Sequence, residues 1–299
     1  MSNGQHIQAD YVVNCGGMWA RQFGEKCGVN IPNQAAEHYY LITDAIPEVD
    51  PSWPIIEDPS SYTYIRPEGT LFMLVITLIC HIFITHSLGA GLMVGLFEPV
   101  AAAWNIKKIP SEFSFGEIEP DWERMAPYVE KAMNRVPATL KVGVKKFFCG
   151  PESFTPDLQP IVGEAPELKN YFVAAGLNSI GILTGGGMGR LLAHWIYHGK
   201  PDMDVTPFNI DRLHKFQANP DYRAARVVET LGMVYKCHYP YKTKDTARKV
   251  KRSPFYDRLV DQNAYFKDVS GWEGADWYAP KGVEPVIKQH TWGTQLLTQ

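Results

Sequence analysis

The sequence has few cysteines and little net charge, and both features limit what the protein can be. Its five cysteines are an odd number, lie far apart and include no CxxC pair. This pattern excludes the common zinc and disulfide frameworks, so no metal site is expected, and it indicates a reducing compartment. The formal net charge of -3 leaves no basic surplus for binding nucleic acid or an anionic membrane.

Two sequence signals are also missing. Residues 1–14 lack the basic and apolar regions of a secretory signal peptide. No GxGxxG motif follows a strand near the N-terminus, and residues 185–189, although rich in glycine, lack the spacing and the βαβ context of a dinucleotide-binding loop. A pyrophosphate-binding loop is therefore not expected in this chain.

Residues 71–84 form a long hydrophobic run in which Thr77 and His81 are the only polar residues. A membrane-spanning helix needs about 20 apolar residues, and no Lys or Arg cluster flanks the run to orient it. Its Ile, Val, Thr and Phe content suits a buried strand, but the run is longer than strands of about 3–10 residues. We therefore interpret the segment as an anomalous insertion and expect no membrane association.

A strand followed by a helix is predicted close to the N-terminus. Residues 10–14 read as a short buried strand that runs into the glycine turn Gly16-Gly17. Residues 18–27 then have helical spacing, with Trp19, Phe23 and Cys27 on one face. A glycine turn between a strand and a helix lets the backbone approach a phosphate or a ring closely, although ordinary packing turns use the same residues.

The rest of the chain has further periodic segments. Beyond Asp211 the sequence becomes polar and rich in proline, which indicates a linker with short elements. The basic segment 242–252 within it suits a solvated linker or a docking surface for an acidic partner, and the acidic residues that follow favour the linker. Strands are expected at 38–43, 62–66 and 171–175, and helices at 117–134 and 190–198, the latter after the glycine-dense stretch 176–189.

Several motifs, in this order, resemble the D-amino-acid-oxidase-like flavoproteins. Within them the chain is similar to the group of dimethylglycine dehydrogenase, sarcosine dehydrogenase and the pyruvate dehydrogenase phosphatase regulatory subunit. The motifs cover most of residues 9–199, and GPESFTPD followed by the glycine-rich run is the most specific signal. They are ADYVVNCGGMWA at 9–20, EHYYLIT at 37–43, YTYIR at 62–66, CGPESFTPD at 149–157, PIVGEAPEL at 160–168, AGLNS at 175–179 and GGGMG at 185–189.

The resemblance implies an α+β fold with an incomplete FAD-binding Rossmann-type domain and an antiparallel-sheet substrate domain. The oxidoreductase part is expected at 9–210, with the substrate-binding part at 31–148. Residues 211–299 are expected to lead toward a folate-binding, aminomethyltransferase-like domain that lies outside this chain. In the family a motif like IRPEG at 65–69 is followed directly by one like GLMVGLFE at 91–98, so the anomalous insert is assigned to 70–90.

The resemblance also implies where the substrate binds. The family's pocket histidine and tyrosine correspond to His38 and Tyr64, as catalytic residues. A histidine that titrates near neutrality can take the proton of an ammonium substrate, and a tyrosine hydroxyl can hydrogen-bond it. Arg66 is a possible partner for a substrate carboxylate, since alternation places it on the same strand face as Tyr64. A structural histidine, a packed tyrosine and a solvent-facing arginine are the alternative interpretations.

The flavin is expected to contact Gly16, Gly17 and Trp19 near the N-terminus and residues 181–184 in the glycine-dense stretch. By resemblance, Gly181, Ile182, Leu183 and Thr184 form a loop whose backbone lines the flavin ring. Related sarcosine oxidases carry at Leu183 a lysine that activates oxygen, so its absence favours a dehydrogenase over an oxidase. Glu152 and Asp157 could act as acid and base, but turn chemistry explains the segment ESFTPD more simply.

The function implied by the resemblance is FAD-dependent oxidative demethylation of a small N-methyl amino acid of the sarcosine or dimethylglycine type. An electron-transfer flavoprotein is the expected acceptor, tetrahydrofolate is expected only with the further domain, and mitochondrial matrix is the implied location. Without the dinucleotide loop and the histidine for covalent flavin attachment, this chain alone is expected to bind FAD weakly. The alternative is a non-catalytic regulatory protein, or an inactive fragment.

Overall fold

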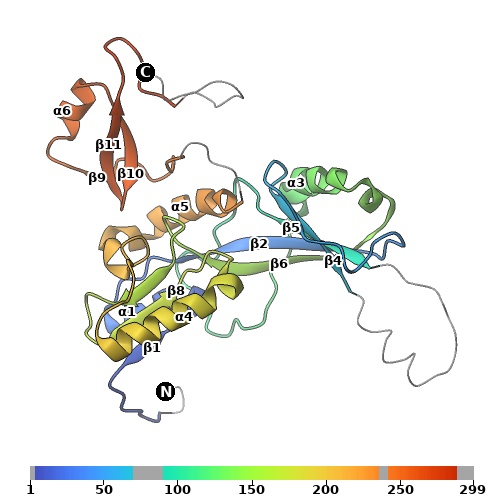
Figure 1. The fold of residues 1–299 in the computed structure, drawn as a ribbon, viewed down its shortest axis with the longest axis horizontal. Helices are drawn as coiled ribbons and strands as arrows, with labels where there is room; N and C mark the ends of the chain where they lie inside the picture. The colour runs from blue at the N-terminus through green and yellow to red at the C-terminus, as the bar shows by residue number, and fades with distance from the viewer. Residues whose placement is uncertain (1–3, 70–89, 236–241, 288–299) are drawn as a thin grey trace.

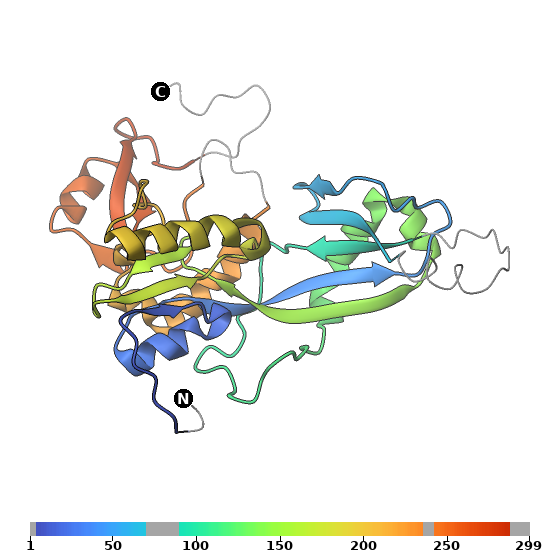
Figure 2. The same ribbon diagram turned by 60° about the horizontal axis from the view of Figure 1, so that its bottom comes forward.

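The computed structural model describes residues 4–69, 90–235 and 242–287, and all structural statements concern these ranges. Two long antiparallel strands, β2 (Gln34–Thr43) and β6 (Val144–Phe154), run through most of its length and join two sheets with their helices (Figures 1 and 2). A further three-stranded sheet lies near the C-terminus. The antiparallel and helical parts together make an α+β fold, as the sequence predicted.

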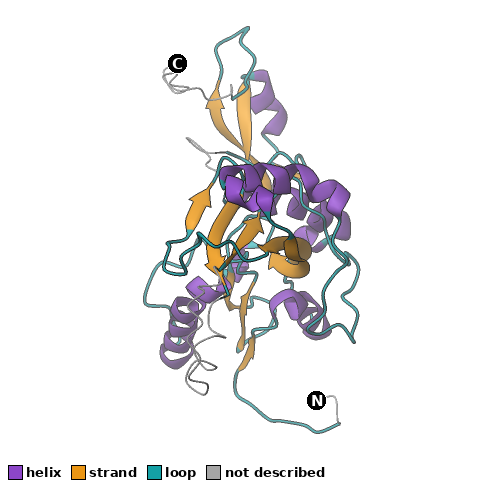
Figure 3. Cartoon of the chain, turned by 90° about the vertical axis from the view of Figure 1, so that its right-hand side faces the viewer, coloured by secondary structure: helices purple, strands orange, loops and turns teal. Residues whose placement is uncertain are grey.

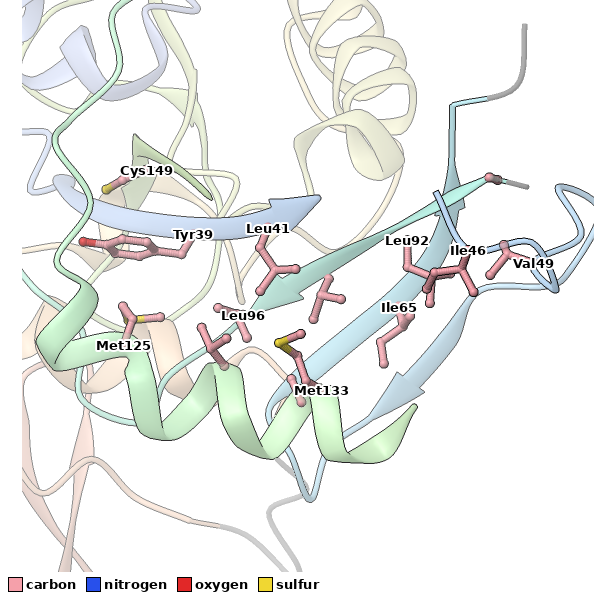
Figure 4. Packing of buried hydrophobic residues seen from close by; sticks show 14 residues of the cluster. Tyr39, Leu41, Ile46, Val49, Ile65, Leu92, Leu96, Met125, Met133 and Cys149 are labelled. Carbon is pink, nitrogen blue, oxygen red and sulfur yellow. The ribbon is translucent and has the colours of Figure 1, made fainter. Parts of the chain in front are cut away.

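The larger sheet has five antiparallel strands in the order β3-β4-β5-β2-β6. One of its faces is covered by helix α3 (Trp122–Arg135), which contributes Met125, Val129 and Met133 to the main core beside Leu41 and Leu96 (Figure 4). Its remaining strands are β3 (Ile56–Asp58), β4 (Thr63–Glu68) and β5 (Gly91–Leu96), and the short helix η2 (Pro137–Lys141) precedes β6.

Helix α3 begins later than residue 117, where the sequence pattern placed its start. Pro120 precedes the helix, and the Asp121 side chain caps it by accepting a hydrogen bond from the Arg124 backbone N–H. A proline followed by an Asp cap is a strong helix start, and the apolar periodicity alone did not separate these residues from the helix.

The smaller three-stranded sheet pairs β1 (Val12–Asn14) in parallel with β8 (Tyr171–Ala175), and β8 antiparallel with β7 (Ile161–Glu164). Helix α1 (Ala20–Cys27), entered through η1 (Gly17–Trp19), packs on one side. Helix α4 (Gly181–His198) packs on the other side through Leu191 and Leu192. This is the Rossmann-like part of the fold.

The expectation that the N-terminal strand is buried is wrong. Val12 and Val13 are 51% and 42% exposed, because β1 is an edge strand with β8 on one side only. Helix α1 buries Ala20, Arg21 and Gly24, whereas Phe23 and Cys27 are exposed.

Helix α4 begins at Gly181 rather than at Arg190, so most of the glycine-dense stretch is helical. Residues 181–184, expected as a loop, form its first turn. Its end at His198 is confirmed, with Gly199 in the left-handed conformation that commonly follows a helix.

The C-terminal range contains more ordered structure than a linker with short elements. Helix α5 (Pro220–Met233) packs on β2 and β6 through Val227 and Leu231. A three-stranded sheet with helix α6 follows it, seen at the top of Figure 3. These elements are η3 (Ile210–Arg212), η4 (Lys215–Ala218), β9 (Lys251–Arg252), α6 (Tyr256–Asp261), β10 (Ala264–Val269) and β11 (Trp272–Tyr278).

Within the described ranges, no helix has the length and hydrophobicity needed to cross a membrane. The hydrophobic run at 71–84 lies outside the described residues, as does the proposed insert apart from Ala90.

Glu229 of α5 ties the helix to the segment that follows it, which yields a testable pH dependence. Its carboxylate accepts hydrogen bonds from the Asp245 and Thr246 N–H groups and from the Thr246 hydroxyl. Burial would raise the pKa of Glu229, but these hydrogen bonds outweigh it and hold the pKa below the usual value. A carboxyl with a lowered folded-state pKa stabilises the fold above its unfolded pKa, and this stability is lost as the pH falls through the folded-state pKa.

The Glu229→Gln variant should therefore lose about 1–3 kcal/mol of unfolding free energy at neutral pH. The difference from the parent should begin to shrink as the pH falls below about 4.3, where the unfolded chain takes up a proton, and should disappear below the lowered folded-state pKa. Urea unfolding at both pH values measures this, with Glu130→Gln on the exposed face of α3 as the control. A difference that stays constant with pH would contradict the role of the charge.

Candidate active site

A cavity of about 1140 Å³ lies between the Rossmann-like part and the five-stranded sheet. Strands β2 and β6, the connection from β8 to α4, the start of α4 and the residues around η1 border it. Ligand cavities typically measure about 300–1,000 Å³, so this one is large enough for a cofactor and a small substrate. Its aromatic lining comes from Trp19, His38, Tyr39, Tyr40, Tyr64, Phe97, Phe113, Phe115, Phe148 and Tyr235.

His38 of β2 lines the cavity in a fixed orientation. It lies opposite Gly150 of β6, and Glu152 pairs with Ala36 in the same register, so His38 and Glu152 are diagonal neighbours on one face. His38 Nδ1 is 3.0 Å from Glu152 Oε2, and the His38 side chain is 10% exposed. Its ring meets Phe97 edge-on with the ring centroids 4.5 Å apart. The structure thus gives the predicted histidine a carboxylate partner.

Glu152 is a site residue that the local sequence pattern assigns to a turn. The assignment of Glu152 to a turn is wrong, because β6 continues to Phe154 through its pairing with β2. Burial alone would raise the pKa of the Glu152 carboxyl, but the hydrogen bond and the charge of His38, with a hydrogen bond from Ser179, bring the pKa below its usual value. Glu152 is therefore ionised at neutral pH.

Ser179 reaches the same histidine from the connection between β8 and α4. Its hydroxyl oxygen lies 3.3 Å from His38 Nδ1. Asn178 and Ser179 both have left-handed backbone conformations, with φ of 52° and 68°. The Asn178 side chain holds this bend by accepting a hydrogen bond from the Thr155 N–H at 2.9 Å. Non-glycine residues in such conformations are uncommon and cluster at functional sites.

Tyr64 of β4 lines the cavity on the side formed by the five-stranded sheet, and its catalytic role stays a prediction. It lies opposite Gly95 of β5, and a Cβ atom at Gly95 would stand 1.9 Å from the Tyr64 ring. Only glycine therefore lets the ring lie flat over β5. Burial raises the pKa of the Tyr64 hydroxyl, so the hydroxyl stays protonated and can donate a hydrogen bond.

Arg66 is on the same strand but outside the cavity lining. Its guanidinium pairs with Glu68 at 2.8 Å, and both side chains are about one-third exposed. The structure therefore does not bring Arg66 together with His38, and its substrate-binding role stays a prediction.

The predicted flavin contacts are partly gathered at the cavity. Gly17 and Trp19 line it beside η1, and Gly181 and Ile182 line it at the start of α4. Three further predicted contacts are adjacent to the cavity but not part of its lining: Gly16, Leu183 and Thr184. Thr184 bonds instead to the Ile180 carbonyl through its hydroxyl, at 2.9 Å.

The start of α4 suits a flat, polar-edged ring such as the flavin of FAD. Ile180, at the N-cap, makes no side-chain capping bond, so the first N–H groups of α4 lack that partner, and Gly181 and Ile182 of this turn line the cavity. Gly185 and Gly189 line the cavity one turn apart, and a Cβ atom at either would meet no atom within 4 Å. A ligand can therefore approach the α4 backbone closely, and the residues present fit the implied cofactor.

Alanine substitutions on α4 test this fit. Gly186→Ala should raise the unfolding free energy of the chain by about 0.5–1 kcal/mol, because glycine disfavours a helix and Gly186 faces open space outside the cavity lining. Gly185→Ala should give a similar gain but weaken FAD binding severalfold, since its methyl group enters the cavity. Chemical unfolding and FAD titration measure the two effects. Equal FAD affinities of the two variants would contradict the proposed position of the ring.

Among the described residues, no group of three or more His, Cys, Asp or Glu side chains is arranged to hold a metal ion.

Comparison with known proteins agrees with this arrangement. Residues 2–195 match the family described as FAD dependent oxidoreductase, and residues 198–253 match the FAD dependent oxidoreductase central domain. The iminodiacetate oxidase of Chelativorans sp. BNC1 has the same fold, with a TM-score of 0.50 and 17% identity over 70% of this chain and 48% of that chain.

Three curated relatives match nearly the whole chain. Human mitochondrial sarcosine dehydrogenase is 35% identical over 96% of this chain and 29% of its own length. The formaldehyde-forming 4-methylaminobutanoate oxidase of Paenarthrobacter nicotinovorans is 37% identical over 93% of this chain and 31% of its own length. The mouse mitochondrial pyruvate dehydrogenase phosphatase regulatory subunit is 31% identical over 92% of this chain and 29% of its own length. The chain thus spans 29 to 31% of the length of these relatives.

The resemblance found in the sequence motifs is confirmed, and it includes mitochondrial dimethylglycine dehydrogenase from rat, at 27% identity over 96% of the chain. A family match that covers residues 2–195, together with the cavity around His38, places the chain in one family. The chain belongs to the FAD-dependent oxidoreductases of the D-amino-acid-oxidase-like fold.

Proposed function

We propose that this chain forms the substrate side of the active site in an FAD-dependent enzyme that oxidises the N-methyl group of a small amino acid. The observation that carries the proposal is the contact between largely buried His38 and ionised, partly exposed Glu152 at an aromatic cavity next to the start of α4. The similarity to sarcosine dehydrogenase and 4-methylaminobutanoate oxidase supports N-methyl amines as substrates.

His38 removes the proton from the substrate ammonium group in this proposal. A carboxylate only accepts hydrogen bonds, so the bond to Glu152 places the proton of the neutral imidazole on Nδ1. The Nε2 lone pair is then available to the substrate. The flavin, when bound, supplies the oxidising power that removes two electrons from the N-methyl carbon. Only the unprotonated amine has the free electron pair that this oxidation requires.

The chain's other residues position the substrate and exclude water. Tyr64 can donate a hydrogen bond to it, and the aromatic lining replaces water around the amine. We further propose sarcosine or dimethylglycine as the substrate type and an electron-transfer flavoprotein as acceptor. We propose the mitochondrial matrix as location, since the related sarcosine and dimethylglycine dehydrogenases are mitochondrial proteins. Transfer of the released one-carbon unit to tetrahydrofolate would require a further domain.

A regulatory role is the second candidate, supported by the 31% identity to the pyruvate dehydrogenase phosphatase regulatory subunit. Such a protein would keep the fold and the cavity without the oxidation.

Anaerobic mixing of the FAD-loaded protein with sarcosine, dimethylglycine or 4-methylaminobutanoate separates the two candidates. Bleaching of the visible flavin absorbance by one of these amines, with formaldehyde as product, supports the enzyme. Bound flavin that none of them reduces supports the regulatory role and overturns the proposed activity.

A further inference from the structure

We propose that the cavity recognises the methylated ammonium group as a cation, through an aromatic wall formed by Tyr64, Phe97 and Tyr235 with Glu152 beside it. The ligand class is thereby widened to quaternary methylammonium compounds, which have no N–H proton to lose. This inference rests on the proposed function only for its link to turnover, because binding by the wall does not require oxidation.

The three rings of the aromatic wall come from separate parts of the chain and contact one another. Phe97 and Tyr235 have their ring centroids 3.9 Å apart, and Tyr64 lies 6.2 Å from each of them. Phe97, which follows β5, is 1% exposed, and the partly buried Tyr64 and Tyr235 pack against the hydrophobic cluster that contains it. Tyr235 follows α5, so the wall joins the C-terminal region to the sheet. All three rings line the cavity.

A negative charge stands next to this wall. The Glu152 carboxylate is ionised and lines the cavity with the three rings, and it contacts His38, whose ring meets Phe97 with the ring centroids 4.5 Å apart. Among the described residues that line the cavity, none is a lysine or an arginine. The local field therefore favours a positive ligand group.

Aromatic faces and a carboxylate together form the usual receptor for methylated ammonium groups. The ring quadrupole attracts a cation that lies within about 6 Å of the ring centre, and methyl groups on nitrogen spread the positive charge over an apolar surface. Such a group loses little hydration and needs no hydrogen-bond acceptor. An ordinary amino group, which keeps all its N–H bonds, would leave donors unpaired against the rings.

Two ligands of the same shape that differ in one positive charge separate the effect of that charge from the effect of shape. Trimethylglycine and 3,3-dimethylbutanoate both carry a carboxylate and three methyl groups, but only the first has a positive nitrogen in place of the quaternary carbon. In isothermal titration calorimetry of the protein with saturating FAD, trimethylglycine should bind at least about tenfold more tightly than 3,3-dimethylbutanoate. Equal affinities, or tighter binding of 3,3-dimethylbutanoate, would overturn the proposal whether or not the protein oxidises sarcosine.

Substitutions then locate the charge recognition. Tyr235→Leu should weaken trimethylglycine binding by about 3- to 30-fold, whereas Tyr235→Phe, which keeps the ring, should stay within about twofold. Tyr197→Leu on the exposed surface of α4 is the matched control and should change nothing. Glu152→Gln should lower the ratio of the trimethylglycine affinity to the 3,3-dimethylbutanoate affinity at least about threefold. A general folding defect would instead weaken the binding of both ligands by the same factor. An unchanged ratio in Glu152→Gln would remove the carboxylate from the proposal.

Discussion

Replacing His38 by asparagine should slow reduction of the flavin by the amine substrate by about 10²- to 10⁴-fold, the usual range for loss of a general base. Asparagine retains a polar group beside Glu152 but has no nitrogen that can accept the substrate proton. The substrate Kd should change far less, because the aromatic wall and the Glu152 charge remain. The effect is therefore expected in the rate of reduction rather than in binding.

Stopped-flow absorbance at several pH values measures this effect. The pH profiles of the parent and of His38→Asn should differ, because the rate in the variant should follow only the fraction of unprotonated amine in solution. His198→Asn on the exposed end of α4 is the control and should leave rate and pH profile unchanged. A loss in His38→Asn of less than about fivefold, with an unchanged profile, would assign His38 a structural role.

The resemblance pointed to His38 and Tyr64, and both line the cavity, but the sequence did not indicate their partners. Glu152 was attributed to turn chemistry because it lies in a segment with Pro156 and Asp157, which are turn formers. Its side chain reaches His38 only because β6 pairs with β2 in one register. That register depends on long-range packing, which local patterns do not contain. The motif itself, with a Glu between Pro151 and Ser153, was the available signal.

Helix α4 shows a second limit of local reasoning. Glycine lowers helix propensity by about 1 kcal/mol per residue, so a stretch with four glycines at 185–189 predicts no helix. The structure nevertheless continues the helix back to Gly181, with Leu191 and Leu192 anchoring its later turns on the sheet. Small residues at the start allow a close approach to the cavity, and this explains why a poor helix former is placed there.

The exposure of β1 shows that an apolar pattern can predict burial where the strand is in fact exposed. Val12 and Val13 form an apolar strand, and such runs usually indicate burial on both faces. In the structure β8 pairs with one edge of β1, and the other edge is open among the described residues. The pattern therefore predicted the element correctly but not its neighbours.

Arg124→Ala should have the largest effect on stability, with a loss of about 3–5 kcal/mol of unfolding free energy. Arg124 of α3 binds Glu98 and Glu37, each at 2.7 Å, and the Tyr39 hydroxyl at 3.1 Å. Glu98 is fully buried, and burial raises its pKa against the opposing effect of Arg124. Without the guanidinium, folding would either keep an unpaired buried charge or protonate Glu98.

Guanidinium chloride unfolding of the parent and the variants measures this loss. Arg135→Ala on the same helix is the control, because the Arg135 side chain is 60% exposed and its pair with Asp58 should contribute less than about 1 kcal/mol. The double variant Glu98→Gln with Arg124→Met should recover part of the stability, since it removes both charges. Arg124→Ala should also be relatively less destabilised at low pH, where Glu98 is neutral in the folded and unfolded states. A loss below about 1 kcal/mol, equal to that of Arg135→Ala, would mean that the pairs with Arg124 do not hold α3 against the sheet that carries His38 and Tyr64.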